Sequence, residues 1–345
     1  MTNALLSVRA RVDALKDRMR LPVIVAPMFL VSGPDLVVAA SRSGVIGSFP
    51  APNARTIADL RQWLETISTS LDRARAKGES PAGWAFNMIT HTTYGRFDEE
   101  LDLVSEFKPE IVISALGGPH RIVDPVHGYG GLVFADVNAP LYAKKAIDKG
   151  ADGLVLVTSG AGGHTGEYSM LAFIDEVRSF WDGPLAVGGA ISRGASIRVV
   201  ENLGVDFAYM GTRFIPTPES LVSREYKQMT VDSSMSDLVA SRALTGALGN
   251  WMKASVVQAG LSLDEMKAEA KIDFSTNFHD VKAWKTVWSA GHGVGVITDV
   301  EPVSQIVDRL ANEYLEAVSQ ERKNTRFEQK LARLEKGRGL SCQVG

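Results

Sequence analysis

Cysteine is almost absent from this chain, whose 345 residues include only Cys342 near the carboxyl end. A single thiol cannot form a disulfide within the chain or supply the cysteine cluster of a structural zinc site. The chain also lacks any apolar run approaching the roughly 20 residues of a membrane-spanning helix. The segment Met1–Arg20 carries several charges and no long apolar stretch, so we expect no signal peptide. These absences predict a soluble, cytoplasmic protein.

An excess of charge of either sign is also missing. The formal net charge is −3, so bulk electrostatics favours no nucleic-acid partner. No H-x-x-x-H pair or carboxylate cluster has the spacing of metal ligands, and no G-x-S-x-G element marks a serine hydrolase. We therefore predict no bound metal and no nucleic-acid or membrane partner.

Short apolar runs are abundant, and they alternate with helix-like stretches. Near-continuous apolar strands, each followed by a helix, are typical of a parallel sheet that is covered on both faces. Eight such units end by about residue 215, which fits an α/β fold of the (β/α)8 TIM-barrel type, whose usual size is about 250 residues. The predicted strands are 23–27, 45–49, 84–88, 111–116, 132–137, 154–158, 185–189 and 207–211, and predicted helices include 54–70, 139–149, 170–181 and 193–203.

A doubly wound sheet is the alternative fold for this alternating pattern. Its dinucleotide-binding fingerprint, G-x-G-x-x-G, is incomplete here. Gly160-Ala161-Gly162 begins the fingerprint, but Thr165 stands where the third glycine belongs. The barrel is therefore the preferred prediction.

After the eighth strand the character of the sequence changes. Residues 216–290 are polar and show no strong strand run, which predicts a smaller helical subdomain over the mouth of a barrel formed by 1–215. We expect 291–322 to return to the barrel and end in a helix at 302–322, and the charged tail 323–345 to be frayed. The inserted tryptophans, Trp251, Trp284 and Trp288, could be core, lid or the contact of a homodimer, and core is the default.

The segment Gly160-Ala161-Gly162-Gly163-His164-Thr165-Gly166 follows the sixth predicted strand. Glycines allow positive φ angles and a close approach of backbone N–H groups to a ligand. Histidine is the side chain that most readily exchanges a proton near neutral pH. This loop is therefore a candidate active-site loop, and the alternative is a tight turn with a surface histidine.

Further candidate residues stand at the ends of other predicted strands. Gly188-Gly189-Ala190 and Met210-Gly211-Thr212-Arg213-Phe214 end the last two, where barrels often bind a phosphate group. Ala26-Pro27-Met28-Phe29 ends the first strand and could cover a flat ligand, although such a methionine is more often core. Asn87 could bind the edge of a ring system or satisfy loop backbone, and Asp136 lies on the same rim.

Taken in chain order, these motifs resemble the nitronate monooxygenases, once called 2-nitropropane dioxygenases. The resemblance rests on Ala26-Pro27-Met28, on Asn87, on the A-G-G-H-T-G loop ending at Gly166, and on the two glycine-rich strand ends. Residues 288–302 also resemble the carboxyl-terminal return of that family. The similarity covers about residues 20–315. Related flavin enzymes, among them NADH:quinone reductases and reductases of enoyl or CoA thioesters, share these elements.

The resemblance implies a barrel that holds FMN without a covalent bond. By position, Gly189, Gly211 and Thr212 would bind its phosphate, Asn87 and the backbone near Met28 would contact the isoalloxazine, and His164 would face a small-molecule substrate. His164 would be the base for a neutral nitroalkane or a hydrogen-bond donor to a nitronate. The predicted cofactor-binding residues are Ala26, Pro27, Met28, Asn87, Asp136, Gly163, Gly188, Gly189, Gly211 and Thr212, with His164 catalytic.

Two departures from the family pattern keep alternatives open. Gly160 stands where many relatives have an acidic residue, and Asp136 and Asn138 occupy a stretch that is often basic or hydroxyl-bearing. The co-substrate would be O₂ in a nitronate monooxygenase. It would be NAD(P)H in a reductase of a quinone or an enoyl thioester, with Arg193 or Arg213 holding a nucleotide phosphate. A third hypothesis is a barrel that binds a phosphorylated ligand without redox chemistry.

Overall fold

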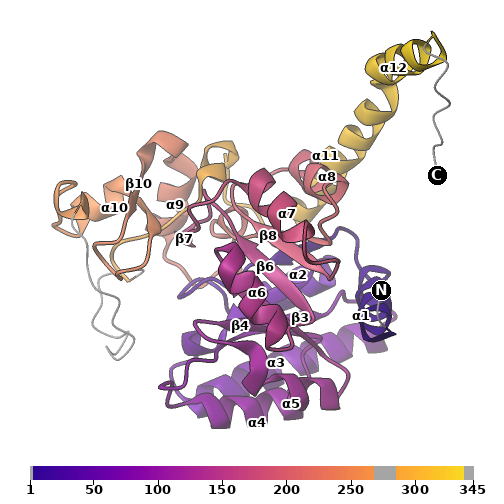
Figure 1. Ribbon diagram of the computed structural model, residues 1–345. Coiled ribbons are helices and arrows are strands. Elements are labelled where there is room, and N and C mark those ends of the chain that lie inside the picture. Colours follow the sequence, from indigo (N-terminus) through magenta and orange to yellow (C-terminus); the bar gives the residue numbers. More distant parts are fainter. Residues whose placement is uncertain (1–2, 268–284, 338–345) are drawn as a thin grey trace.

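Each of the eight apolar runs forms a strand in the computed structural model, which describes residues 3–267 and 285–337. Neighbouring strands are parallel, in the order β1-β9-β8-β6-β5-β4-β3-β2. A parallel bridge between Ile24 and Ile46 joins β1 to β2 and closes the ring, which confirms the predicted (β/α)8 barrel (Figure 1). The strands are β1 (Val23–Val25), β2 (Gly47–Pro50), β3 (Trp84–Ile89), β4 (Ile111–Ala115), β5 (Leu132–Val137), β6 (Gly153–Val157), β8 (Leu185–Gly188) and β9 (Phe207–Met210).

Amphipathic helices cover the outside of the barrel. In α3, for example, Thr56 and Asp59 form a capping box, and Leu60, Leu64 and Ile67 are buried on one face. The helix α11 packs against α8 and α2 and so completes the ring of helices. These helices are α2 (Pro34–Arg42), α3 (Ile57–Ala76), α4 (Phe97–Phe107), α5 (Val123–Gly128), α6 (Pro140–Asp148), α7 (Met170–Arg178), α8 (Gly194–Asn202) and α11 (Val303–Lys323). Short 3₁₀ turns are η1 (Ala51–Asn53), η2 (Pro119–Arg121), η3 (Thr212–Phe214), η4 (Met235–Asp237), η5 (Glu265–Lys267) and η6 (His292–Val296).

An amino-terminal helix, α1 (Asn3–Lys16), closes the end of the barrel at which the strands begin. Its Val8, Val12 and Leu15 share one core cluster with side chains of the barrel interior, such as Phe134 and Phe207. This helix was not among the elements expected from the sequence. Because α1 plugs this end, a ligand can reach the barrel core only from the end at which the strands stop.

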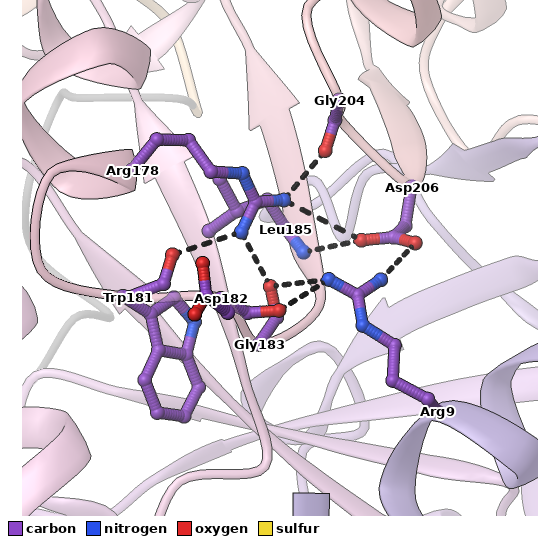
Figure 2. A network of polar contacts seen from close by, with 8 residues as sticks. All are labelled: Arg9, Arg178, Trp181, Asp182, Gly183, Leu185, Gly204 and Asp206. Atoms are coloured by element: carbon purple, nitrogen blue, oxygen red, sulfur yellow. Dashed lines mark hydrogen bonds and ion pairs between the residues drawn. The ribbon is translucent and has the colours of Figure 1, made fainter. Parts of the chain in front are cut away.

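Arg9 of α1 and Arg178 of α7 both bind the loops before β8 and β9, and Arg9 thereby fixes α1 to them (Figure 2). Arg9 lies 2.6 Å from the buried carboxylate of Asp206 and also donates to the carbonyls of Asp182 and Gly183. Arg178 donates 2.7 Å to the same Gly183 carbonyl. The second oxygen of Asp206 accepts the backbone N–H of Leu185 at 2.9 Å. This network is structural and lies at the opposite end from the candidate site.

Replacing Asp206 by alanine should lower the free energy of unfolding by about 2 kcal/mol, because it leaves Arg9 and a buried N–H without their shared acceptor. Urea denaturation measures the change. The matched control is Asp72→Ala, which removes an exposed pair with Arg75 at 2.8 Å and should change stability by less than about 0.5 kcal/mol. Equal losses in the two variants would contradict the structural role of the network.

The sequence predicted a helical insertion after β9, but the insertion also contains strands. Beside α9 (Arg224–Asp232) and α10 (Lys253–Gln258) it forms two strands, β10 (Leu238–Ser241) and β11 (Gly249–Met252). They make a three-stranded sheet with β7 (Gly163–His164), which belongs to the glycine-rich loop. The two strands are short and one contains glycine and asparagine, so their sequence carries little strand signal. β10 pairs with β11 in a hairpin, and β11 also pairs with β7 of the distant loop, so pairing rather than local propensity defines these strands.

The tryptophans of the insertion pack within it. Trp251 is fully buried, and Trp288 stacks on Tyr226 with ring centroids 5.0 Å apart. Trp251 is therefore core, as its default interpretation predicted, whereas Trp284 lies outside the described residues.

Among the helices of residues 3–267 and 285–337, none is long and apolar enough to cross a membrane.

The tail forms a helix, α12 (Arg326–Gly337), where we expected frayed chain. Its sequence is rich in strong helix formers such as Glu, Lys, Leu and Arg, which explains the difference. The helix extends away from the barrel beyond α11 (Figure 1). Phe327, Leu331 and Leu334 on it are exposed.

Candidate active site

The insertion holds the glycine-rich loop at the open end of the barrel. In the β7–β11 pair, Gly249 lies opposite His164 and Asn250 opposite Gly163. The Asn250 side chain donates 2.7 Å to the carbonyl of Ala161. On the far side of the histidine, the N–H of Thr165 donates 2.9 Å to the carbonyl of Leu248. The loop that follows β6 is therefore one edge of a small sheet, and His164 has a fixed place.

Two glycines of the site have backbone conformations that side-chain-bearing residues rarely adopt. Gly163 has a φ of +66°, which places the residue before His164 in the left-handed region. Gly189 has a φ of +145°, and a Cβ there would lie 2.1 Å from Oγ1 of Thr158. Thr158 itself donates 2.9 Å to the carbonyl of Gly188. The sequence argument for bare backbone at these strand ends therefore has a geometric basis.

His164 lies at the rim with its ring in contact with the insertion. Its Nε2 is 3.3 Å from Oγ1 of Thr245. The side chain is exposed at the open mouth, yet protein crowds around the ring, and the resulting loss of solvation lowers its pKa to about 4. At pH 7 the imidazole is therefore neutral and offers one donor and one acceptor, so the resting ring is not an imidazolium.

The loops after β8 and β9, where a phosphate site was predicted, lie against the glycine-rich loop. Thr212 Oγ1 accepts the N–H of Gly291 at 2.8 Å, and a Cβ on Gly162 would lie 3.1 Å from the same oxygen. The first N–H of α8, on Gly194, donates 2.7 Å to Glu313. That N–H is therefore engaged, and the candidate phosphate contacts are the strand-end loops at Gly188–Gly189 and Gly211–Thr212.

The end of β1 lies beside the end of β9. Ala26 N–H donates 3.0 Å to the carbonyl of Met210, and a Cβ on Gly211 would lie 3.3 Å from Sδ of Met28. The carbonyl of Met28 accepts the Asn53 side chain at 3.0 Å. Ala26, Pro27 and Met28 are all partly exposed here. The structure thus brings the predicted apolar cover next to the predicted phosphate loop.

Three polar side chains occupy the top of the barrel interior. Asn87 donates to Asp136 at 3.4 Å and to the carbonyl of Ile113 at 3.4 Å. Asp136 Oδ1 and the hydroxyl of Tyr209 are enclosed, and neither has a hydrogen-bond partner within the described residues. Burial raises the pKa of Asp136 to about 7. It also raises the pKa of Tyr209, with a smaller contribution from Asp136.

This donor set fits an FMN molecule. Buried polar atoms are rarely left without partners, so Asp136 Oδ1 and the Tyr209 hydroxyl indicate a polar ligand above them. Asn87 adds an amide at the same place, and Met28 adds an apolar surface. A ring system with both polar edges and an apolar face has this chemistry. The glycine loops supply backbone for a phosphate.

The arginines considered for a nucleotide phosphate are engaged elsewhere. Arg213 is buried, with Nη2 3.1 Å from Glu301, which also pairs with Arg309. Arg193 is exposed, with Nε 3.7 Å from Glu313 on α11. Neither contact lies at the mouth beside His164. Within the described part of the chain, no group of His, Cys, Asp and Glu side chains is suited to a metal ion.

Sequence reasoning missed three residues of this region. Tyr209 was visible as one hydroxyl in an otherwise apolar strand, and this signal could have been used. Thr245 and Asn250 carry no signal of their own, because the insertion brings them to the site through β11. The backbone N–H of His292 donates 2.9 Å to the carbonyl of Gly160 in the same region.

Comparison with known proteins finds similarity to nitronate monooxygenases over most of the chain. The sequence model of the nitronate monooxygenase family matches residues 13–313. A nitronate monooxygenase of Neurospora crassa is 26% identical, over 86% of this chain and 90% of that protein. A (3aS,4S,5R,7aS)-5-hydroxy-7a-methyl-1-oxo-octahydro-1H-indene-4-carboxyl-CoA dehydrogenase of Rhodococcus jostii is 24% identical over 65% of this chain. The chain spans only 60% of the length of that dehydrogenase and 64% of one of the same name from Mycobacterium tuberculosis.

Two solved structures share the fold. The nitroalkane oxidase from Streptomyces ansochromogenes superposes with a TM-score of 0.75 at 21% identity, over 89% of this chain and 99% of that chain. FabK from Thermotoga maritima superposes with a TM-score of 0.71 at 21% identity, over 91% of this chain and 98% of that chain. At these identities the likeness is one of barrel architecture.

Proposed function

The chain belongs to the nitronate monooxygenase family, and on this premise we propose that it is an FMN-dependent oxidoreductase that oxidises alkyl nitronates with O₂ to a carbonyl compound and nitrite. The observation that carries the proposal is the position of His164. Its neutral ring lies on β7 at the open end of the barrel. The glycine loops and the Asn87–Asp136 pair stand at the same end.

FMN, when bound, supplies the redox chemistry, and the protein supplies binding, orientation and electrostatics. The loops at Gly188–Gly189 and Gly211–Thr212 would hold the phosphate through backbone N–H groups and through the hydroxyl proton of Thr212, whose oxygen accepts the N–H of Gly291. Asn87, Asp136 and Tyr209 would bind polar atoms of the ring system. Met28 and Pro27 would contact its apolar surface. The insertion, through β11, keeps the histidine loop in place at the open end of the barrel.

For a neutral nitroalkane, His164 takes the proton on the carbon that bears the nitro group. The C–H bond breaks, its electron pair remains on the substrate as the nitronate, and the proton goes to the imidazole. The ring becomes a cation beside the anion it has formed, which favours this step electrostatically. A substrate supplied as the nitronate has already lost this proton and needs no base.

The anaerobic absorption spectrum of the purified protein tests the proposal. We expect a yellow protein, or one that becomes yellow on adding FMN, whose flavin bleaches with an alkyl nitronate but not with NADH or NADPH. Matched titrations of the three reductants at one pH provide the comparison.

Other outcomes of this titration identify the alternatives. Prompt bleaching by NADH or NADPH, with turnover driven by a quinone or an enoyl thioester, would replace the proposal with a reductase. A protein that stays colourless with added FMN would leave only a barrel that binds a phosphorylated ligand.

A further inference from the structure

A short chain of hydrogen bonds begins at the ring of His164. Its Nε2 lies 3.3 Å from Oγ1 of Thr245, and the same Oγ1 donates 3.1 Å to the carbonyl oxygen of Ala247. Thr245 and Ala247 belong to the hairpin between β10 and β11, which enters this site only because β11 pairs with β7. This series of hydrogen bonds therefore connects the insertion to the imidazole.

The carbonyl of Ala247 determines which atom donates in each of these hydrogen bonds. A carbonyl oxygen can only accept a hydrogen bond, so the Thr245 hydroxyl must place its one proton toward Ala247. The side of Oγ1 that faces the ring is then a lone pair, and Nε2 must bring the proton to that contact. In a neutral imidazole one nitrogen carries the proton, so Nδ1 is the proton-free acceptor.

We propose that Thr245 is a positioning residue that selects the tautomer of His164, with the proton on Nε2 and the lone pair on Nδ1. The opposite tautomer would place two lone pairs against each other. Otherwise the hydroxyl would have to turn away from the Ala247 carbonyl. Either arrangement gives up a hydrogen bond, a cost of about 1 kcal/mol that shifts the tautomer ratio several-fold.

The consequence for catalysis rests on the proposed function. Nδ1 is then the atom that receives the proton of a neutral nitroalkane, and the Nε2–Thr245 contact strengthens when the ring becomes charged. Thr245 acts through the histidine and touches no reacting atom in this account. Its effect should therefore appear with nitroalkanes and disappear with preformed nitronates.

Nitrogen NMR of protein labelled with ¹⁵N-histidine tests the tautomer directly. We expect His164 to show a protonated Nε2 and an unprotonated Nδ1 at pH 7, with its signals identified by their loss in His164→Gln. Thr245→Val, which removes the hydroxyl at nearly constant shape, should shift the ring toward a mixture of tautomers, and Thr245→Ser should restore the native pattern.

The chain offers a matched control in a second histidine–threonine pair. His91 Nδ1 lies 2.8 Å from Oγ1 of Thr93, so Thr93→Val should change the signals of His91 and leave those of His164 unchanged. A wild-type His164 that carries its proton on Nδ1 would overturn the proposal. An unchanged tautomer in Thr245→Val would do the same.

Kinetics provide the second measurement. Thr245→Val should lower kcat for neutral nitroalkanes by about tenfold, leave nitronate oxidation within about twofold, and recover in Thr245→Ser. Equal losses on both substrates would contradict tautomer selection and indicate a general loss of site structure. If the protein oxidises neither substrate, the proposed function fails while the NMR spectrum still decides the tautomer.

Discussion

Replacing His164 by alanine should lower the rate on neutral nitroalkanes by about 10²-fold and change the rate on preformed nitronates much less. General bases contribute roughly 10²–10⁴-fold, and a ring whose pKa is lowered to about 4 is a weak base, so we expect the lower end of this range. A preformed nitronate has no proton to lose, and the neutral ring contributes little to its oxidation. Steady-state assays with the two forms of one substrate, at one pH, measure the difference.

The pH dependence of the same reaction follows from the direction of the shift. Loss of solvation lowers the pKa of His164 from 6.5 to about 4, so the base-competent neutral ring persists as the pH falls through 6. Nitroalkane activity should therefore not decline between pH 8 and pH 6 through protonation of this residue. A decline with a midpoint near 6.5 that is absent in His164→Ala would contradict the lowered pKa of His164.

A matched control for the alanine variant is His91→Ala. His91 follows β3 on the same rim, and its Nδ1 is paired with Thr93 at 2.8 Å. We expect both substrates to be oxidised at nearly the wild-type rate in this variant. Equal losses on nitroalkane and nitronate in His164→Ala, or a wild-type enzyme without nitroalkane activity, would refute the role of His164 as a base.

The barrel could be predicted because its strands are buried on both faces. Such strands read as near-continuous apolar runs, and all eight of them form strands within one or two residues of the expected ends. The helix α1 was missed, although its buried Val8, Val12 and Leu15 follow helical spacing. The strands β10 and β11 were missed for a different reason. They pair with each other, and β11 also pairs with β7, which lies far earlier in the chain.

The same distinction applies to the site. Glycines and His164 could be located from the sequence because they directly follow strands, and all barrel strands end at one rim. The partners that determine their chemistry come from elsewhere. Thr245 is 81 positions from His164, and Asn87 is 49 positions from Asp136. Local sequence patterns do not predict such long-range contacts, and residue spacing does not predict that Asp136 Oδ1 is enclosed.

The enclosure of the Asp136 carboxyl should make the affinity for FMN depend on pH. Burial raises its pKa from 3.8 to about 7, against a smaller opposing effect of the Asn87 hydrogen bond. Below pH 7 the group is a neutral carboxylic acid that could donate a hydrogen bond to the flavin. Above pH 7 it ionises, and a carboxylate could only accept hydrogen bonds. Since one proton is involved, the affinity should fall by up to tenfold for each pH unit above 7.

Quenching of FMN fluorescence by the apoprotein between pH 6 and pH 9 measures this effect. The control is Asp136→Asn, which keeps a donor at every pH and should bind FMN without the decline above pH 7. The FMN phosphate also titrates, with a pKa of about 6 by analogy with other phosphomonoesters, and its contribution is common to both proteins. The comparison therefore isolates Asp136, and parallel curves for wild type and variant would show that this carboxyl does not face the flavin.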